Sequence, residues 1–175
     1  TVKDAELDAC GRAEREAFQK AFLAAHEKQQ RNVRAKNTDE AVFYDDYYFE
    51  GPLLFKRGRD GRVRSGAYFL SVFLFSEKDL TVSWRAFWLL REQREAHEET
   101  VSYAQIQEVR WIEPPESPFT SFRKYRFLGF YDAAGAELCS APVIQDAATE
   151  ELLRKINGRL RAAKAQEPED PHKDQ

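Results

Sequence analysis

The stretch T-V-S-Y-A-Q-I-Q-E-V-R-W-I-E, from Thr100 to Glu113, determines how the rest of the chain is read. Its apolar side chains are Val101, Tyr103, Ile106, Val109 and Trp111. Their period-2 alternation breaks once, around Tyr103 to Gln105, and resumes from Val109, which predicts a strand, a short kink and a second strand. Strand-rich segments lie on both sides of it, so the chain is expected to be mainly β with flanking helices.

The composition fits one soluble domain of ordinary size. The chain has 175 residues, of which 42% are hydrophobic, with 13 Phe, 7 Tyr and 3 Trp. This is enough for a real core and argues against intrinsic disorder in the middle of the chain. The net charge of −3 argues against a nucleic-acid partner. Aromatic strands beside a basic edge would suit single-stranded nucleic acid, and this stays a formal alternative.

Cysteine usage and hydropathy bear on the compartment. Cys10 and Cys139 share no metal-binding or redox spacing, so two reduced, packed thiols are predicted, with a disulfide left as the alternative. The longest apolar run, Ala67 to Phe75, has about half the length of a membrane span. We therefore expect a cytoplasmic protein, with a peripheral membrane location as the alternative. Met is absent even at position 1, so a processed or truncated chain with an upstream anchor also stays open.

The N-terminal segment from Lys3 to about Ala35 is predicted to be a helix with Asp4 as its N-cap. Small residues recur every four positions, at Ala9, Ala13, Ala17, Ala21 and Ala25. Together with Cys10, Phe18 and Phe22 they predict a narrow face suited to close packing. A helix that covers its own domain is the favoured interpretation, and a helix that forms a dimer or binds a partner is the alternative.

The middle of the chain is predicted to contain several strands. The aromatic segment from Ala41 to Glu50 comes first. A β-hairpin from Pro52 to Ser76 follows, with its turn at Gly58 to Gly61 and one continuous strand from Val63 to Phe75. Leu80 to Arg91 is predicted to be a strand, and the charged run from Glu92 to Glu99 a loop. A short helix over Ala86 to Glu99 is the competing interpretation.

The C-terminal part is predicted from its turn residues and caps. Pro114 to Pro118 must be a loop, because proline cannot donate to a ladder. A hairpin is expected from Ser121 to Tyr131 and Ala136 to Val143, and then a helix from Asp146 to Ala163, capped by Asp146 or Thr149. The predicted domain plan is a helix at 1–37, a β domain with its helix at 38–164, and a disordered tail at 165–175.

This order of elements resembles the bacterial pleckstrin-homology-like (PH-like) and GRAM-like domains. The resemblance rests on the Val101 to Ile106 segment, on the aromatic strands before it, and on Leu152 to Leu160 in the last helix. It covers about Pro52 to Lys164. It implies an antiparallel barrel of about six or seven strands closed by a C-terminal helix, and a non-enzymatic binding function.

The first hairpin carries the best candidate site. Five basic residues flank its turn, against Asp60 as the one acid: Lys56, Arg57, Arg59, Arg62 and Arg64. Cations on a hairpin can converge on a phosphate or an acidic lipid surface, and PH-like domains that bind phosphoinositides use such a hairpin. Arg123, Lys124 and Arg126 would extend the patch if their hairpin lies nearby. A solvated turn that favours solubility is the alternative.

Catalytic and metal chemistry have little support. No phosphate-loop, dinucleotide or nucleophile-elbow motif is present. His97 next to Glu98 and Glu99 lacks the spacing of a helical zinc site, and Asp45 and Asp46 should point to opposite faces of a strand. No metal and no cofactor are predicted.

The predicted function is therefore binding, to a protein partner or to an anionic membrane surface. The alternative is a small-ligand-binding or enzymatic β-barrel whose cavity is lined by aromatic residues. These are Tyr68, Phe69, Trp84, Trp88 and Trp111.

Overall fold

The structure is a computed structural model that describes residues 3–31, 40–50, 55–89 and 93–166. These residues form a mainly antiparallel α+β fold with a helix at each end of the chain. The helices are α1 (Asp4–Arg31) and α2 (Ala147–Ala165), and two 3₁₀ turns are η1 (Tyr103–Gln105) and η2 (Thr120–Phe122). The strands are β1 (Glu40–Tyr47), β2 (Phe55–Arg57), β3 (Val63–Ser65), β4 (Ala67–Phe75), β5 (Asp79–Trp88), β6 (Arg94–Ser102), β7 (Glu108–Ile112), β8 (Tyr125–Tyr131) and β9 (Glu137–Ile144).

The described strands form three separate antiparallel sheets. Four of them pair in the order β1-β4-β5-β6, β7-β8-β9 form a second sheet, and β2-β3 form a small hairpin inserted between β1 and β4. These described sheets do not join into a closed barrel, so β6 and β9 each keep an outer edge without a neighbouring strand. Pro142 in β9 agrees with an edge position, because proline has no N–H to donate.

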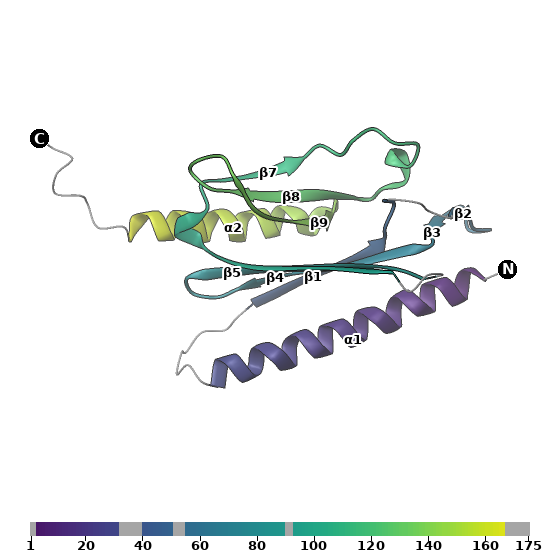
Figure 1. Cartoon of the computed structure of the whole chain (residues 1–175), viewed down its shortest axis with the longest axis horizontal. Helices are drawn as coiled ribbons and strands as arrows, with labels where there is room; N and C mark the ends of the chain where they lie inside the picture. Colours follow the sequence, from purple (N-terminus) through teal and green to yellow (C-terminus); the bar gives the residue numbers. More distant parts are fainter. Residues whose placement is uncertain (1–2, 32–39, 51–54, 90–92, 167–175) are drawn as a thin grey trace, which may run out of the picture.

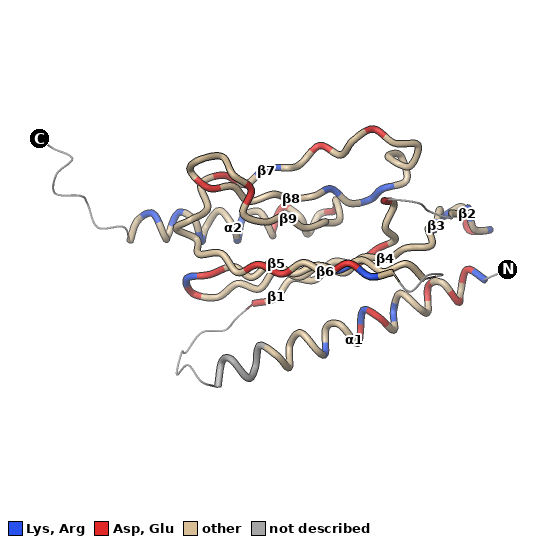
Figure 2. Tube along the Cα trace, in the orientation of Figure 1, with Lys and Arg blue, Asp and Glu red and all other residues tan. Residues whose placement is uncertain are grey.

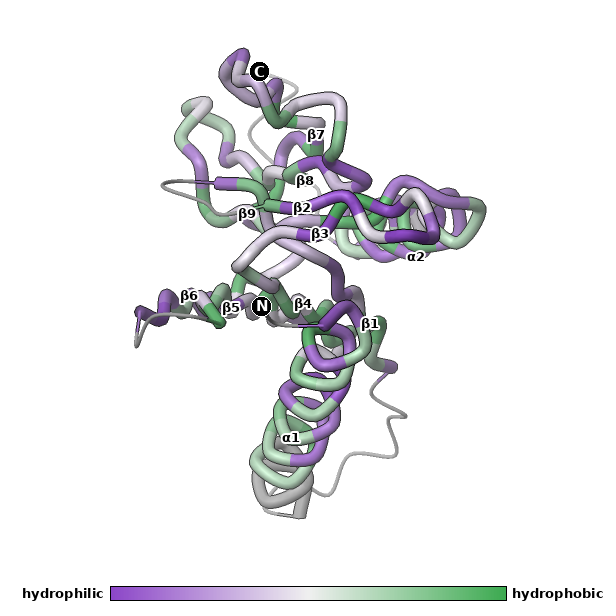
Figure 3. Tube along the Cα trace, turned by 90° about the vertical axis from the view of Figure 1, so that its right-hand side faces the viewer, coloured by the Kyte–Doolittle hydropathy of each residue, from purple (hydrophilic) through white to green (hydrophobic). Residues whose placement is uncertain are grey.

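The elements stack in layers. Figure 1 shows α1 along one side of the four-stranded sheet, and the β7-β8-β9 sheet with α2 on the other side. The end-on view of Figure 3 shows α2 on the β1 side of this upper layer. Strand β4 of the four-stranded sheet is thus covered on both faces, and all nine of its residues are buried. A strand buried on both faces needs the continuous apolar run that this segment has.

The stretch from Thr100 to Glu113 folds as its alternation predicts. β6 ends at Ser102, the chain makes the 3₁₀ turn η1, and β7 begins at Glu108. Gln105 closes the turn by accepting a hydrogen bond from the Ser102 N–H at 3.1 Å. Tyr103 and Ile106 are buried in the core, whereas Trp111 is half-buried. The kink therefore carries the chain from the first sheet to the second.

Two predictions about the middle of the chain are wrong. The charged run that was expected to be a loop belongs to β6 from Arg94 onward, because its backbone pairs with β5 along the whole length of the strand. The long outgoing strand of the first hairpin is interrupted at Gly66, so that β3 pairs with β2 while β4 pairs with β1 and β5. The expected strand after Leu80 is confirmed as far as Trp88, and the competing helix is not formed.

Helix α1 covers its own sheet, as the favoured interpretation predicts, but it packs with only the aromatic part of the predicted face. The alanines that were expected to pack are exposed at positions 9, 13, 17, 21 and 25. The buried side is formed by Leu7, Phe18 and Phe22, and Phe18 lies under the guanidinium of Arg85 at 4.3 Å. Large apolar side chains release more free energy on burial than alanine, and they decide which face packs.

The C-terminal predictions are largely confirmed. The β8–β9 hairpin turns at Asp132 to Gly135, where Gly135 has a φ of 80°. Asp146 is the N-cap of α2, because its carboxylate accepts from the Ala148 N–H at 3.0 Å. The predicted end of the first helix, at about Ala35, and most of the predicted tail, residues 167–175, lie outside the described residues. In the described part, no helix is long and apolar enough to cross a membrane.

Candidate functional site

The hairpin with the predicted basic site is docked on the first turns of α1. Arg64 is only 3% exposed and binds Asp8, with Nε at 3.0 Å from Oδ1 and Nη2 at 3.1 Å from Oδ2. Its Nη2 also lies 2.8 Å from Oδ2 of Asp60 in the turn. Lys56 Nζ lies 2.6 Å from Oδ1 of Asp4. Two of the five candidate cations therefore hold the hairpin and α1 together.

The electrostatics of these contacts follow from the pairing. Hydrogen bonds from Arg64 lower the pKa of Asp8 and of Asp60, and a hydrogen bond from Lys56 lowers the pKa of Asp4. The same hydrogen bonds, which Arg64 donates to Asp60 and to Asp8, raise the pKa of Arg64, and the one to Asp60 has the larger effect. All these charged groups are therefore stabilised in their ionised forms. The sequence predicts a local charge of +4 around this turn, and Asp4 and Asp8 reduce it to +2.

Three arginines of the hairpin remain exposed: Arg57, Arg59 and Arg62. Beside them lies Phe55, which is 52% exposed and is one of two exposed large hydrophobic side chains among the described residues. The centroid of its ring lies 5.3 Å from that of Phe119 and 5.9 Å from that of Phe122, and both of these residues belong to the segment before β8. This end of the molecule, at the right of Figure 1, therefore combines exposed cations with an aromatic cluster.

The predicted extension of the patch divides in the same way. The Arg123 side chain is 4% exposed, and its Nη2 lies 3.0 Å from Oε2 of Glu50. Burial raises the pKa of Glu50 even though the Arg123 charge opposes this shift. Arg126 lies 2.5 Å from Glu113 and 5.5 Å above the Trp111 ring. Lys124 is the one fully exposed cation of these three residues.

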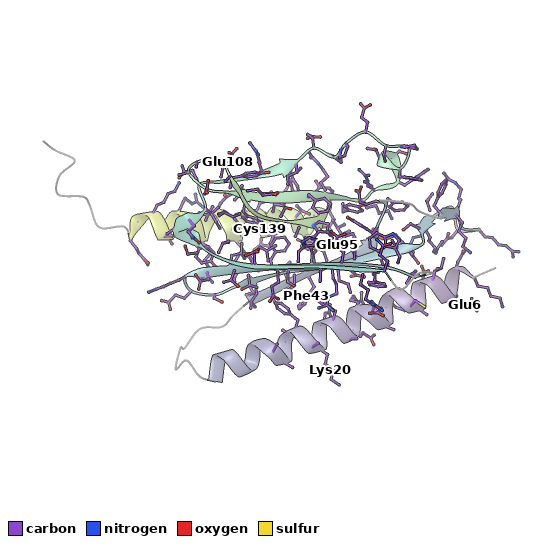
Figure 4. All side chains as sticks on the ribbon, in the orientation of Figure 1. Glu6, Lys20, Phe43, Glu95, Glu108 and Cys139 are labelled. Carbon is purple, nitrogen blue, oxygen red and sulfur yellow. The ribbon has the colours of Figure 1, made fainter. Side chains whose placement is uncertain are left out.

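A second site lies between the edge strands β6 and β9. It is a groove of about 640 Å³, larger than the hollow of about 390 Å³ beside α2. Its aromatic lining residues are Tyr48, Trp84 and Phe127, and its acidic ones are Glu95, Glu98, Glu99 and Glu137. No Lys or Arg is among the described residues that line it. Figure 2 shows the acidic positions of β6 in the lower layer, and Figure 4 labels Glu95 and Cys139 between the two sheets.

The floor of the groove is ordered by ring contacts. The His97 ring stacks on Trp84 with centroids 4.6 Å apart and an interplanar angle of 16°, and it is hydrogen-bonded to Glu95 at 2.7 Å. Phe127 meets Trp84 edge-on at 5.4 Å. Burial, together with the charges of Glu99 and Glu137, raises the pKa of Cys139 to about 12. The groove therefore has an aromatic floor, and the glutamates that line it give it a negative potential.

Comparison with known proteins finds no matching family model, no matching curated protein and no matching solved structure. The resemblance to PH-like domains therefore stays a prediction.

The other candidates of the sequence lie in different places. Asp45 is bound by the Tyr68 hydroxyl and lies 3.6 Å from Arg15 of α1, whereas Asp46 accepts from the Tyr47 N–H at 2.7 Å. Among the described residues, no cluster of His, Cys, Asp and Glu could hold a metal ion. Both cysteines are free, but Cys10 is exposed, which corrects the prediction of two packed thiols.

The acidic groove was missed because its residues were assigned to a loop. The side chains from Arg94 to Thr100 point alternately to the two faces of the sheet, but all of them are exposed. The segment therefore has no apolar residue at every second position that would identify it as a strand. One signal was available in the sequence. The polar run before Val101 is long enough to form a strand of its own, and in a β-meander such a strand would pair with β5. Of the five aromatics predicted to line a cavity, Trp84 lines this groove and Trp111 lies half-buried under Arg126. The other three, Tyr68, Phe69 and Trp88, are buried in the core.

Proposed function

We propose that this chain is a non-enzymatic PH-like interaction module that attaches to anionic membrane surfaces through the end formed by β2, β3 and η2. The strand order supports the first part of the proposal. A four-stranded meander, interrupted by one inserted hairpin, leads into a three-stranded meander and a C-terminal helix. From the β2–β3 hairpin to α2, antiparallel strands followed by a C-terminal helix agree with the order that the PH-like resemblance implies, and α1 and β1 lie outside the part of the chain that it covers.

The observation that carries the membrane part is the exposed Phe55 beside Arg57, Arg59 and Arg62. Aromatic side chains enter the interface between headgroups and acyl chains, and cations next to them are attracted by acidic lipids. The rings of Phe119 and Phe122 pack against the Phe55 ring. Lys56 and Arg64 contribute by fixing the hairpin to α1 rather than by binding lipid.

The expected strength is modest. Each arginine near an acidic surface contributes about 1 kcal/mol, and the partial burial of one Phe adds about 1–2 kcal/mol. Three arginines and Phe55 thus support weak, reversible attachment that needs a high content of acidic lipid. The binding should weaken with salt, because exposed charges are screened.

Co-sedimentation with phosphatidylcholine vesicles of increasing phosphatidylserine content tests the proposal. We expect wild-type protein to sediment with acidic vesicles, Arg57→Glu/Arg59→Glu to stay in the supernatant, and Phe55→Ser to bind several-fold more weakly. Arg154→Glu/Arg161→Glu on α2 is the matched control, since it reverses two exposed charges elsewhere. Soluble inositol hexakisphosphate distinguishes a free phosphate ligand from a membrane, because a free ligand would compete without any vesicle.

Two results would overturn the membrane proposal. One is equal, negligible sedimentation of wild type and both hairpin variants at every lipid composition. The other is equal loss of binding in the α2 control, which would mean a diffuse charge effect rather than a site on the hairpin.

A further inference from the structure

The outer edge of β6 is a regular strand that lacks a partner in the described part of the chain. All residues from Arg94 to Thr100 are exposed. The Trp88 N–H donates to the Gln93 carbonyl at 3.1 Å, and the Tyr103 N–H donates to the Lys78 carbonyl at 3.0 Å, at the two ends of the β5–β6 pair. The register between these two ends has no shift, and hydrogen-bonded pairs alternate along an antiparallel ladder. The backbone N–H and C=O groups of the odd-numbered residues of β6 therefore pair with β5. The even-numbered ones present their N–H and C=O groups outward: Arg94, Ala96, Glu98 and Thr100.

The side chains on the groove side of β6 form an acidic row. Residues directly opposite in an antiparallel pair share a face, and Glu95, His97 and Glu99 lie opposite Ala86, Trp84 and Val82. These three side chains therefore stand over the groove that Trp84 floors. Glu137 at the start of β9 closes it from the other sheet. A strand added beside β6 would direct every second side chain at these carboxylates.

We propose that this groove binds an extended basic segment of a partner protein, which adds to the outer edge of β6 as a further strand. The backbone of the segment pairs with the outward groups of Ala96 and Glu98. Its Lys or Arg side chains at alternate positions reach Glu95, Glu99 and Glu137, and their aliphatic stems lie against the His97 ring that is stacked on Trp84.

Charge complementarity selects this occupant among the alternatives. A second copy of the chain would bring the same acidic edge, and two such edges repel each other. Acidic or phosphorylated segments are excluded for the same reason. A basic strand is attracted, and burial against the apolar floor strengthens its ion pairs relative to water. The proposal uses none of the hairpin residues that carry the membrane proposal, so the two can fail separately.

Fluorescence anisotropy of a labelled peptide of about nine residues, with Lys alternating with Thr and Val, tests the proposal on the full chain. We expect saturable binding with a Kd of roughly 10–100 μM at low salt. A peptide with Glu in place of Lys should not bind. A basic peptide with Pro at alternate Thr positions should bind at least about fivefold more weakly, since proline prevents strand addition.

Variants of the protein test the contribution of the acidic side chains and that of backbone pairing at the edge of β6 separately. Glu95→Gln/Glu99→Gln should weaken binding about tenfold, whereas Glu150→Gln/Glu151→Gln, which removes the same charge from α2, should change it by less than about twofold. Ala96→Pro removes one outward N–H and leaves the ladder to β5 intact, so it should weaken binding about fivefold without unfolding the protein. Slower amide hydrogen exchange at Ala96, Glu98 and Thr100 in the presence of peptide would support the same geometry.

Each of the opposite outcomes would overturn the proposal. Equal affinity for basic and acidic peptides, or equal losses in the β6 and α2 variants, would remove charge recognition in the groove. Binding that ignores Ala96→Pro would remove strand addition. A dimer in light scattering that Ala96→Pro dissociates would mean that the edge serves a second copy of the chain instead.

Discussion

Arg64 is the most buried cation of the hairpin, and it binds carboxylates from two different elements. Asp8 also accepts a hydrogen bond from the Tyr47 hydroxyl at 2.6 Å, so the carboxylate joins α1, β1 and β3. A buried guanidinium is tolerable only when its donors are satisfied, and these carboxylates satisfy them. The Arg64–Asp8 ion pair takes Arg64 out of the exposed patch. The same ion pair holds the hairpin against α1 and so fixes where its exposed arginines lie.

The Asp8–Arg64 contact should make the stability of the protein dependent on acid pH. The pKa of Asp8 in the folded protein lies below its ordinary value of 3.8, so the stabilisation is present above about pH 4 and is lost as the pH falls further. We expect Asp8→Asn to be about 1 kcal/mol less stable at neutral pH, after solvent screening, and to lose less stability than wild type on acidification. Urea unfolding at several pH values, followed by tryptophan fluorescence, measures both.

Glu16→Gln provides the control for this experiment, because it removes one exposed carboxylate from the same helix. It should keep the pH dependence of the wild type. An Asp8→Asn protein whose stability falls with acid as steeply as that of the wild type would contradict the assigned role of Asp8.

Helix α1 approaches the sheet closely because of one glycine. A Cβ atom at Gly11 would lie 2.8 Å from Cε2 of Tyr68, a buried side chain whose hydroxyl is bound to Asp45. The ring cannot move away without breaking that bond and its edge contact with Tyr47 at 5.2 Å. Gly158 in α2 differs, since a Cβ there would meet nothing within 4 Å.

The two helical glycines should therefore respond oppositely to alanine. Gly158→Ala should raise the free energy of unfolding by about 0.5–1 kcal/mol through helix propensity. Gly11→Ala gains the same propensity but overpacks the helix–sheet contact at a cost of about 1–3 kcal/mol, so it should be neutral or destabilising. Denaturant unfolding of both variants measures the difference. Equal stabilisation at the two positions would contradict the close contact.

The molecule as a whole protects one thiol and exposes the other. Cys10 lies exposed on α1, whereas Cys139 lies half-buried in β9 beside two glutamates. Burial is the main cause that raises the pKa of Cys139 to about 12, so its thiolate form is rare at neutral pH. Because the thiolate is the reactive form, its accessibility reports on the packing of the two sheets.

Thiol titration of the native protein at about pH 8 should therefore show one fast and one slow group. We expect Cys10 to react readily and Cys139 to react at least about a hundredfold more slowly, until denaturant is added. Cys10→Ser should leave only the slow reaction, and Cys139→Ser only the fast one. A fast native reaction of the Cys10→Ser protein would contradict the placement of Cys139.

The sequence predicted the elements that have strong local signals. The alternation and kink of Thr100 to Glu113, the Asp146 cap, and the glycine turn before β9 each depend on neighbouring residues alone. It failed at β6, whose exposed side chains have no apolar period, and at the alanines of α1, which are exposed although Phe18 and Phe22 of the same predicted face are buried. It also assigned Arg64 and Arg123 to an exposed patch, since no local pattern reveals a partner far away in the chain.

What the sequence determined by itself is thus the set of segments with periodic burial, together with the turns and caps between them, because these are fixed by backbone preferences and nearest neighbours. Tertiary structure alone decided which charges are available. Asp4 and Asp8 reach the hairpin only after α1 has packed on the sheet, and the acidic groove exists only because β6 and β9 end two different sheets. The reason is that ion pairs and grooves depend on distances between segments far apart in the chain, which folding sets through burial of the whole core.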